Sequence, residues 1–264
     1  MVSAVYQLPP QWKVVWVTGA SSGIGREIAL RLAASGVTVA ASARSVDKLA
    51  ELASASPSIK VYPLDVVDLE ATKVVAAEIE RDLGPIDLAI LNAGVWNFMG
   101  ATTYDAQVVN QSLAVNYTGV TNALAPLLPA MIARKSGHIA IVSSVAGYRG
   151  LPIAVAYAPT KAALINLAES LYPELADLGV KVSVINPGFV ESPMTKDNKF
   201  PMPFIISTEE AVDTIIKGLI KGRFEIVFPW RMKWLATICR MLPNSWYFAF
   251  VRSLPDEAPE HRTK

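Results

Sequence analysis

Short runs of β-branched and aliphatic residues alternate with longer helix-like segments along most of the chain. Segments such as 24–36 and 69–84 carry apolar residues at helical spacing and separate the short runs. Because the short runs are apolar at successive positions, they predict a parallel sheet that helices cover on both faces. We therefore predict an α/β fold, a single doubly wound domain with a parallel seven-stranded sheet. The predicted strands are residues 14–18, 37–43, 59–63, 86–93, 138–144, 180–186 and 224–228.

No repeat, low-complexity tract or linker divides the 264 residues. The alternating pattern occupies about 12–228, within which the apolar stretch 189–207 is predicted to be a substrate lid, and 229–264 is an added C-terminal extension. In open α/β sheets, ligands bind beyond the carboxyl ends of the strands. The residues that follow the predicted strands are therefore the candidates for chemistry.

The composition is apolar for a globular domain. Charged residues make up 18% of the chain, against about 25% in typical domains, and the mean hydropathy is +0.34. Such a chain is expected to bury apolar surface against a partner, a lipid interface or an apolar ligand. The net charge of +1 gives no nucleic-acid footprint. With Cys239 as the single cysteine and no secretory pattern at the start, we expect a reducing, cytoplasmic location.

A glycine-rich stretch, TGASSGIG (18–25), follows the first predicted strand and opens a helix. Gly19, Gly23 and Gly25 let the backbone turn tightly and approach a pyrophosphate, which the helix N-terminus attracts. The spacing is G-x-x-x-G-x-G rather than the general G-x-G-x-x-G. Such a turn can also be a plain tight connection, but its place between the first strand and a helix favours nucleotide binding.

The second predicted strand ends in ASARS (41–45), where an acidic residue would bind a ribose 2′-hydroxyl and select NAD. Arg44 stands there instead, beside Ser45, and no carboxylate comes before Asp47. A guanidinium group suits a 2′-phosphate or stacks on adenine, although a solvated surface arginine is the alternative. We predict NADP(H) as the preferred cofactor and keep NAD(H) as the alternative.

A tyrosine and a lysine stand four residues apart in AYAPTK (156–161). On a helix, Tyr157 and Lys161 share one face. At ~4 Å and an effective dielectric of ~20, an ammonium would stabilise a phenolate by on the order of 4 kcal/mol, about three pKa units. The pair therefore predicts a lowered tyrosine pKa. An ordinary surface pair is the alternative for an isolated YxxxK. Because Pro159 is tolerated only in a first helical turn, Tyr157 is expected near a helix start.

With these two motifs, the chain resembles the short-chain dehydrogenases/reductases, in the branch built on TGxxxGxG and YxxxK, over about residues 12–228. The resemblance implies a Rossmann-type NAD(P)-binding domain that transfers hydride between a nicotinamide and a carbonyl or secondary alcohol. It assigns the catalytic residues Asn116, Ser144, Tyr157 and Lys161, with Ser143 the weaker serine candidate. It assigns the cofactor to Gly19, Ser21, Ser22, Gly23, Ile24, Gly25, Arg44, Ser45, Asp65, Val66, Asn92, Ala93, Gly94, Tyr157, Lys161, Pro187, Gly188, Val190 and Ser192.

The sequence departs from the family pattern at three places. Leu91 replaces the first asparagine of NNAG, Ser192 stands where threonine is common, with Thr195 nearby, and Thr160 precedes the lysine. The resemblance implies that Tyr157 is the general acid or base, Ser144 orients the substrate oxygen and Lys161 binds the ribose. Asn116 would hold a water, or be a structural amide. No His/Cys/Asp cluster has metal-ligand spacing, so we predict no metal.

The loops beyond the strand ends are apolar and predict a lipophilic substrate that is steroid-like, terpenoid or a long-chain acyl compound. Core packing is the alternative for each residue. The predicted substrate residues are Trp96, Tyr148, Phe189, Met194 and Phe204.

The segment 229–252 mixes aromatic and basic residues, and Arg240 and Pro243 interrupt it. Packing within the protein is favoured, while a cover over the cleft, a partner subunit and peripheral contact with a membrane interface stay open. The resemblance implies a homodimer or homotetramer through helices at about 106–133 and 155–178. A non-catalytic NADPH-binding sensor or scaffold would be expected to lack part of the catalytic set, which is complete here.

Overall fold

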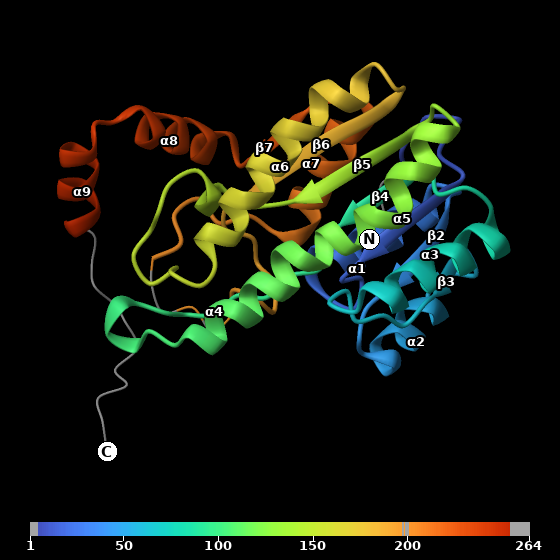
Figure 1. Cartoon of the computed structure of the whole chain (residues 1–264), viewed down its shortest axis with the longest axis horizontal. Helices are drawn as coiled ribbons and strands as arrows, with labels where there is room; N and C mark the ends of the chain where they lie inside the picture. Colours follow the sequence, from blue (N-terminus) through green and yellow to red (C-terminus); the bar gives the residue numbers. More distant parts are fainter. Residues whose placement is uncertain (1–4, 197, 199–200, 254–264) are drawn as a thin grey trace.

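The computed structural model describes residues 5–196, 198 and 201–253 and consists of one parallel sheet between two layers of helices (Figure 1). The strand order is β3-β2-β1-β4-β5-β6-β7, and every pair is parallel. This confirms the predicted doubly wound α/β fold. The strands are β1 (Val14–Thr18), β2 (Thr38–Ser42), β3 (Ile59–Val61), β4 (Leu88–Leu91), β5 (Gly137–Val142), β6 (Val180–Pro187) and β7 (Glu225–Phe228).

Nine α-helices and three shorter turns connect and follow the strands in the described part of the chain. The helix predicted over 106–133 contains a π-helical turn, η2 (Ala114–Thr118), between α4 and α5. The α-helices are α1 (Gly23–Ala34), α2 (Val46–Ser54), α3 (Leu69–Leu83), α4 (Ala106–Leu113), α5 (Gly119–Ala133), α6 (Ala158–Ala176), α7 (Thr208–Ile220), α8 (Trp230–Met241) and α9 (Asn244–Arg252). The 3-10 turns are η1 (Ala101–Thr103) and η3 (Val145–Gly147).

Each strand places alternate side chains in opposite core layers, as the two-residue period of a strand requires. In β1, Val15 and Val17 join the layer that includes α1 and α7, whereas Val14 and Trp16 join the layer that includes α3, α5 and α6. Both layers are buried because helices cover both sheet faces. This explains why the strand sequences are apolar at successive positions.

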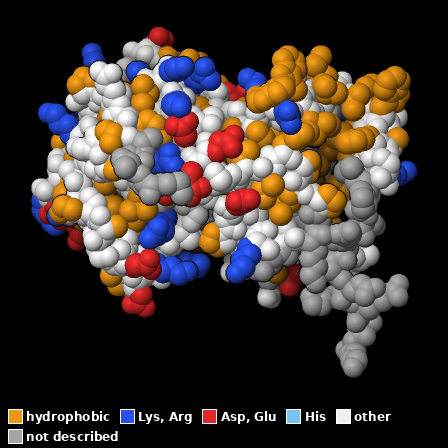
Figure 2. All heavy atoms as spheres, turned by 180° about the vertical axis from the view of Figure 1, so that it is seen from behind, with side chains coloured by type: hydrophobic (Ala, Val, Ile, Leu, Met, Phe, Trp, Pro, Cys, Tyr) orange, Lys and Arg blue, Asp and Glu red, His pale blue; other side chains and the backbone are white. Residues whose placement is uncertain are grey.

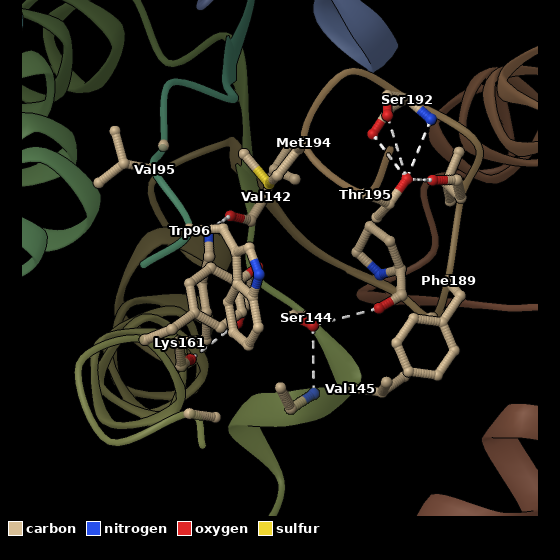
Figure 3. Close-up of a pocket in the computed structure, with 18 of the residues that line it drawn as sticks. Val95, Trp96, Val142, Ser144, Val145, Lys161, Phe189, Ser192, Met194 and Thr195 are labelled. Carbon is tan, nitrogen blue, oxygen red and sulfur yellow. Dashed lines mark hydrogen bonds between the residues drawn. The ribbon is translucent and has the colours of Figure 1, made fainter. Parts of the chain in front are cut away.

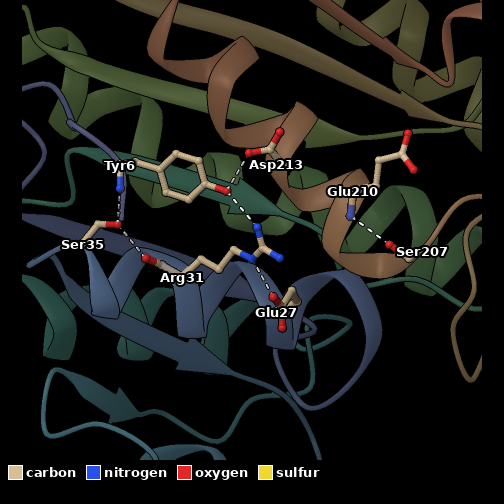
Figure 4. Close-up of polar contacts among 7 residues, drawn as sticks. All are labelled: Tyr6, Glu27, Arg31, Ser35, Ser207, Glu210 and Asp213. Carbon is tan, nitrogen blue, oxygen red and sulfur yellow. Dashed lines mark hydrogen bonds and ion pairs between the residues drawn. The ribbon is translucent and has the colours of Figure 1, made fainter. Parts of the chain in front are cut away.

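A polar cluster fastens the N-terminal segment across α1 and α7 (Figure 4). The hydroxyl of Tyr6 donates to Asp213 Oδ1 at 3.1 Å and accepts from Arg31 Nη1 at 3.0 Å. Arg31 also pairs with Glu27 one turn before it on α1, at 2.6 Å. None of these side chains lines the cavity described below, so the cluster supports the fold rather than the site.

Candidate active site

The loop after β1 leaves its backbone open to close approach by a ligand. Gly19 has φ +67°, and a Cβ there would lie 2.8 Å from the Cα of Ala93. Gly23 has φ +53° and begins α1. The side chain of Asn92, at the end of β4, donates to the carbonyls of Thr18 and Gly19 at 3.1 and 3.2 Å. The Asn-Ala-Gly stretch after β4 therefore holds the glycine loop, and a helix N-terminus faces the opening.

A cavity of about 1010 Å³ lies along the carboxyl ends of the strands. It includes the topological switch point between β1 and β4, where the strand order reverses direction. This volume is at the upper end of the range for ligand pockets. All but one of the predicted cofactor residues line it. Gly25 is the exception, because its Cα faces the Gly19 carbonyl oxygen, where a Cβ would overlap. Its role is to let helix α1 pack against the glycine loop.

Two further predicted residues lie outside the cavity lining. Asn116 is fully buried in η2, and Phe204 is 43% exposed beside the C-terminal extension. The guanidinium of Arg231 lies 5.6 Å from the centroid of the Phe204 ring. Phe204 therefore lies near Arg231 of α8 and outside the cavity lining, which corrects its assignment as a lining residue.

Ser144 and Tyr157 face each other at the middle of the cavity. Ser144 caps η3, where its Oγ accepts from the backbone N–H of Ala146 at 3.1 Å and lies 3.3 Å from the carbonyl of Pro187 (Figure 3). Tyr157 is the residue before α6 begins, which agrees with the position expected from Pro159. The Ser144 hydroxyl lies close enough to Tyr157 to oppose the rise that burial imposes on the pKa of the tyrosine. The two hydroxyl groups thus lie on the same side of the sheet, within one site.

The neighbouring serine has a different role. Ser143 Oγ donates to the backbone carbonyl of Lys161 at 2.7 Å and is buried. Its hydroxyl is therefore occupied in joining β5 to α6. This leaves Ser144 as the serine that faces the reacting groups.

The pKa of Tyr157 is opposite to the sequence expectation. Burial raises the pKa of Tyr157 to about 12, while the hydrogen bond with Ser144 opposes the rise. Lys161 Nζ donates to the carbonyl of Val142 at 2.9 Å and lies 5.5 Å from the centroid of the tyrosine ring. Burial lowers the pKa of Lys161 to about 8. Because both groups are desolvated and the ammonium contacts a carbonyl rather than the phenol oxygen, Tyr157 is a neutral acid here.

Both amide hydrogens of Asn116 are used within the protein. Its Oδ1 accepts from the N–H of Val95 at 2.7 Å, and its Nδ2 donates to the carbonyl of Val95 and to Thr160 Oγ1, both at 3.0 Å. Thr160 donates in turn to the carbonyl of Tyr157 at 2.7 Å. Asn116 therefore joins the loop after β4 to the start of α6, which is the structural alternative for this residue. Its side chain has no amide hydrogen left for the predicted water.

Aromatic and aliphatic side chains line the substrate side of Tyr157. The ring of Trp96 packs edge-on against the ring of Tyr157, with centroids 4.7 Å apart. Phe189 and Met194 line the cavity from the loop after β6 (Figure 3). Tyr148 also lines it, but its hydroxyl donates to Glu225 Oε1 at 2.5 Å and accepts from Asn186 Nδ2. Only its ring is available to a substrate.

The loop 189–207 lies over the nucleotide end of the cavity. The Cβ of Ser192 is 3.5 Å from the position that a Cβ on Gly23 would take. Thr195 Oγ1 donates to the carbonyl of Val190 at 2.6 Å and accepts from the backbone N–H of Ser192 at 3.1 Å (Figure 3). Thr195 thus shapes the turn, and its hydroxyl is committed to the backbone. Residues 197, 199 and 200 of this loop lie outside the described residues.

The C-terminal extension supplies one wall of the cavity, which sequence analysis kept only as one of several alternatives. Arg149, in the loop after Ser144, donates to the carbonyls of Cys239 and Leu242 at 2.5 and 2.7 Å, and its guanidinium lies 4.0 Å from the centroid of the Tyr247 ring. These carbonyls belong to the C-terminal end of α8, where helices have unpaired acceptors. The extension residues that line the cavity include Met232, Leu235, Ala236, Cys239, Tyr247 and Phe250.

Lys48 also lines the cavity, and the sequence analysis did not predict it. It lies on the first turn of α2, four residues after Arg44, and both side chains line the nucleotide end of the cavity. The four-residue spacing of Arg44 and Lys48 at the start of α2 could have indicated that both cations lie on the same side of this turn. Ser42, the last residue of β2, is buried and accepts a hydrogen bond from the indole Nε1 of Trp16 at 2.9 Å.

Comparison with known proteins identifies the family. The family model described as short chain dehydrogenase matches residues 13–201. The chain belongs to the short-chain dehydrogenase family. It is therefore an oxidoreductase that acts on CH–OH or C=O groups with NAD(P). The family match spans the glycine loop, Ser144, Tyr157 and Lys161, so the residues that line the cavity centre lie within it.

Individual relatives of this short-chain dehydrogenase agree with the assignment. An uncharacterized oxidoreductase of Myxococcus xanthus is 38% identical over 92% of this chain and 98% of its own. The 3-oxoacyl-[acyl-carrier-protein] reductase FabG of Thermotoga maritima is 34% identical, with 80% and 84% covered.

Two solved structures show the same fold. A short-chain dehydrogenase from Streptomyces avermitilis has a TM-score of 0.78 at 28% identity, with 91% of this chain and 93% of that one covered. An alcohol dehydrogenase from Thermococcus sibiricus, complexed with 5-hydroxy-NADP, has a TM-score of 0.73 at 25% identity, with 82% and 95% covered.

Within residues 5–196, 198 and 201–253, no three His, Cys, Asp or Glu side chains gather as metal ligands. That the reaction needs no metal ion stays a prediction from the sequence.

Proposed function

We propose that this short-chain dehydrogenase is an NADP(H)-dependent reductase of lipophilic ketones, with a steroid-like, terpenoid or long-chain acyl substrate. The observation that supports this is the continuity of one cavity. Its lining runs from Arg44 and Lys48, past Ser144 and Tyr157, to apolar side chains of the lid and of α8 and α9. A basic end, a proton-donating centre and an apolar end suit a phosphorylated cofactor and an apolar carbonyl compound.

The cofactor preference rests on the two cations after β2. Arg44 and Lys48 line the cavity, whereas Asp47, the first carboxylate after the strand, does not. A guanidinium and an ammonium together suit a 2′-phosphate, and among the described carboxylates only Asp65 lines the cavity, after β3 rather than after β2. The Thermococcus sibiricus neighbour, whose structure holds an NADP analogue, is consistent with this choice.

The site residues divide the work of carbonyl reduction. The bound nicotinamide supplies the hydride. Tyr157, neutral at physiological pH because burial raises its pKa to about 12, donates a proton to the carbonyl oxygen as negative charge develops there. Ser144 donates a hydrogen bond to the same oxygen, and Lys161 would hold the ribose hydroxyls of the cofactor. The tyrosine regains its proton from solvent once the alcohol has left. Asn116 keeps the loop after β4 in register with α6.

The substrate class rests on the walls around Tyr157. Trp96, Phe189 and Met194 present apolar surface, and the extension adds Met232 and further apolar side chains. Burying apolar substrate surface stabilises the complex by about 25 cal/mol per Å². A lipophilic ketone therefore gains more from this cavity than a small polar one. The acyl option is consistent with the FabG relative, which is named as a reductase of 3-oxoacyl groups on acyl-carrier protein.

A consumption assay tests the proposal. NADPH oxidation is followed with ketones graded by size and polarity and repeated with NADH. We expect rates to rise with apolar size and NADPH to be preferred. The double variant Arg44→Ala/Lys48→Ala should lower the NADPH-over-NADH preference by about 100-fold, since each charged contact contributes about 1.5 kcal/mol or more.

The matched control is Arg81→Ala, which removes an exposed cation on α3 that does not line the cavity. An unchanged cofactor preference in the double variant would remove the assignment of NADP(H). The absence of NADPH or NADH oxidation with every ketone would contradict the proposed reaction.

A further inference from the structure

Large apolar side chains cover the outer surface of α8 and α9. Figure 2 shows hydrophobic side chains gathered over this end of the molecule. The most exposed are Met241 at 80%, Trp246 at 69%, Trp230 at 67% and Trp234 at 64%. Exposed apolar groups of this density mark a surface that meets a partner or a membrane.

Helix α8 presents apolar residues on two opposite sides. Trp230, Trp234 and Ile238 recur every four residues and are exposed. Met232, Ala236 and Cys239 lie about half a helical turn away and line the cavity. The row with Met232 is apolar because it lines the cavity. The row with Trp230, Trp234 and Ile238 does not line the cavity, so its apolar character needs another explanation. A second apolar row on the exposed side of a helix is not explained by core packing.

The charges on this surface are all positive. Arg231, Lys233, Arg240 and Arg252 are exposed, and residues 229–253 contain no aspartate or glutamate. Arg240 lies 4.0 Å from Glu169 of α6, at the outer limit of an ion pair. The surface therefore pairs tryptophan side chains with cations, a combination suited to the interface of a bilayer with anionic lipids.

We propose that the outer surface of α8 and α9 docks on a lipid bilayer that contains anionic headgroups. Leu235 and Phe250 are both exposed and part of the cavity lining, so the docking surface is continuous with the rim of the cavity. A lipophilic substrate dissolved in the bilayer would then reach Tyr157 along an apolar path. This substrate route rests on the proposed function, whereas the docking itself does not.

The helices lie along the bilayer surface rather than crossing it. Among the residues that the structure describes, no helix is long and apolar enough to span a membrane. Arg149 holds the end of α8 to the loop after Ser144 through two backbone carbonyls, so the surface is presented as a fixed unit. A second copy of the chain fits this surface less well. A symmetric contact would bring like charges such as Arg231 and Lys233 together.

A flotation experiment with the full chain tests the docking. The protein is mixed with vesicles of phosphatidylcholine and phosphatidylglycerol at about four to one, and with vesicles of phosphatidylcholine alone. We expect the protein to float with the anionic vesicles and to dissociate as salt rises. The double variant Trp234→Glu/Trp246→Glu should lose about tenfold or more of the vesicle-bound fraction.

The matched control is Val46→Glu/Val74→Glu, which places the same charges on exposed apolar positions of α2 and α3, 57% and 56% exposed. It should float like the parent chain. Neither Trp234 nor Trp246 lines the cavity, so turnover of a water-soluble ketone in the first variant reports the reaction independently of docking.

Failure of the parent chain to float would overturn the proposal, whatever the turnover. Equal loss of flotation in both double variants would overturn it as well. If light scattering shows that Trp234→Glu/Trp246→Glu dissociates an oligomer and no variant floats, the surface is a contact between copies and the membrane proposal is wrong. Loss of turnover with retained flotation would instead count against the proposed reaction alone.

Discussion

At the scale of single residues, burial decides the chemistry of Tyr157 and Lys161. A Coulomb estimate from their spacing favours a lowered tyrosine pKa, but desolvation raises the pKa of Tyr157 to about 12 and lowers the pKa of Lys161 to about 8. The neutral phenol is a proton donor, which suits carbonyl reduction. The contacts that place it, with Ser144 and Trp96, come from other elements.

The Tyr157→Phe substitution tests this role. Removal of the hydroxyl leaves the ring that packs on Trp96, so we expect normal folding and normal NADPH binding with turnover reduced by about 10³-fold or more. NADPH binding is measured by fluorescence titration and turnover by NADPH consumption. A Ser143→Ala variant is the comparison, since its hydroxyl joins β5 to α6 and does not face Tyr157. Turnover of Tyr157→Phe at the parent rate would remove the tyrosine from the mechanism.

At the scale of elements, the loop after β5 and the C-terminal helices act as one unit. Arg149 donates to the last carbonyls of α8 and to Asn244 Oδ1 at the start of α9, and Tyr247 donates to the carbonyl of Gly150 at 2.6 Å. The Cys239 and Leu242 carbonyls are groups that the end of α8 leaves without a helical partner. The extension is thereby fixed over the substrate end of the cavity.

The Arg149→Ala substitution should release the extension. Loss of three charge-assisted hydrogen bonds and of the contact with the Tyr247 ring should open α8 to trypsin, with cleavage after Lys233 or Arg240 about tenfold faster. The KM for an apolar ketone should rise more than kcat falls, because the wall, and not the proton donor, is disturbed. Limited proteolysis and steady-state kinetics measure these effects. Cleavage rates equal to those of Arg81→Ala would contradict the fixed extension.

At the scale of the whole molecule, stability depends on two apolar layers and on the few polar groups buried between them. His138 on β5 is buried, its Nε2 lies 2.8 Å from Ser183 Oγ, and burial with the nearby Lys181 lowers its pKa to about 4.

Acid should therefore destabilise the fold through His138. Between pH 6.5 and about 4 the unfolded chain binds a proton that the folded chain excludes, so the free energy of unfolding falls as pH falls through this window. The full difference is on the order of 3 kcal/mol. Urea unfolding at about pH 7 and about pH 4.5 measures it. The His138→Gln variant should lose this part of the pH dependence, and an identical dependence in both proteins would contradict the assignment.

The fold and most of the residues that line the nucleotide end of the cavity followed from local pattern. Strand and helix periodicity predicted the sheet, and the glycine loop, Asn92 and the Ser144, Tyr157 and Lys161 set predicted where the cavity centre lies, because each motif follows a strand. The surroundings of two predicted residues did not follow from the sequence. Whether Asn116 or Phe204 faces a cavity depends on neighbours from distant segments, Thr160 in one case and Arg231 in the other. Residue type and local spacing do not predict which distant residues become neighbours in the fold.

The sequence by itself determined the doubly wound fold and the order of motifs along its strand ends, since periodicity, glycine and proline act over a few residues. Tertiary structure alone decided the protonation of Tyr157, the structural use of Asn116 and the place of the C-terminal helices over the cavity. These depend on desolvation and on hydrogen bonds between segments far apart in the chain. Such bonds exist only once the sheet has brought the strand ends together.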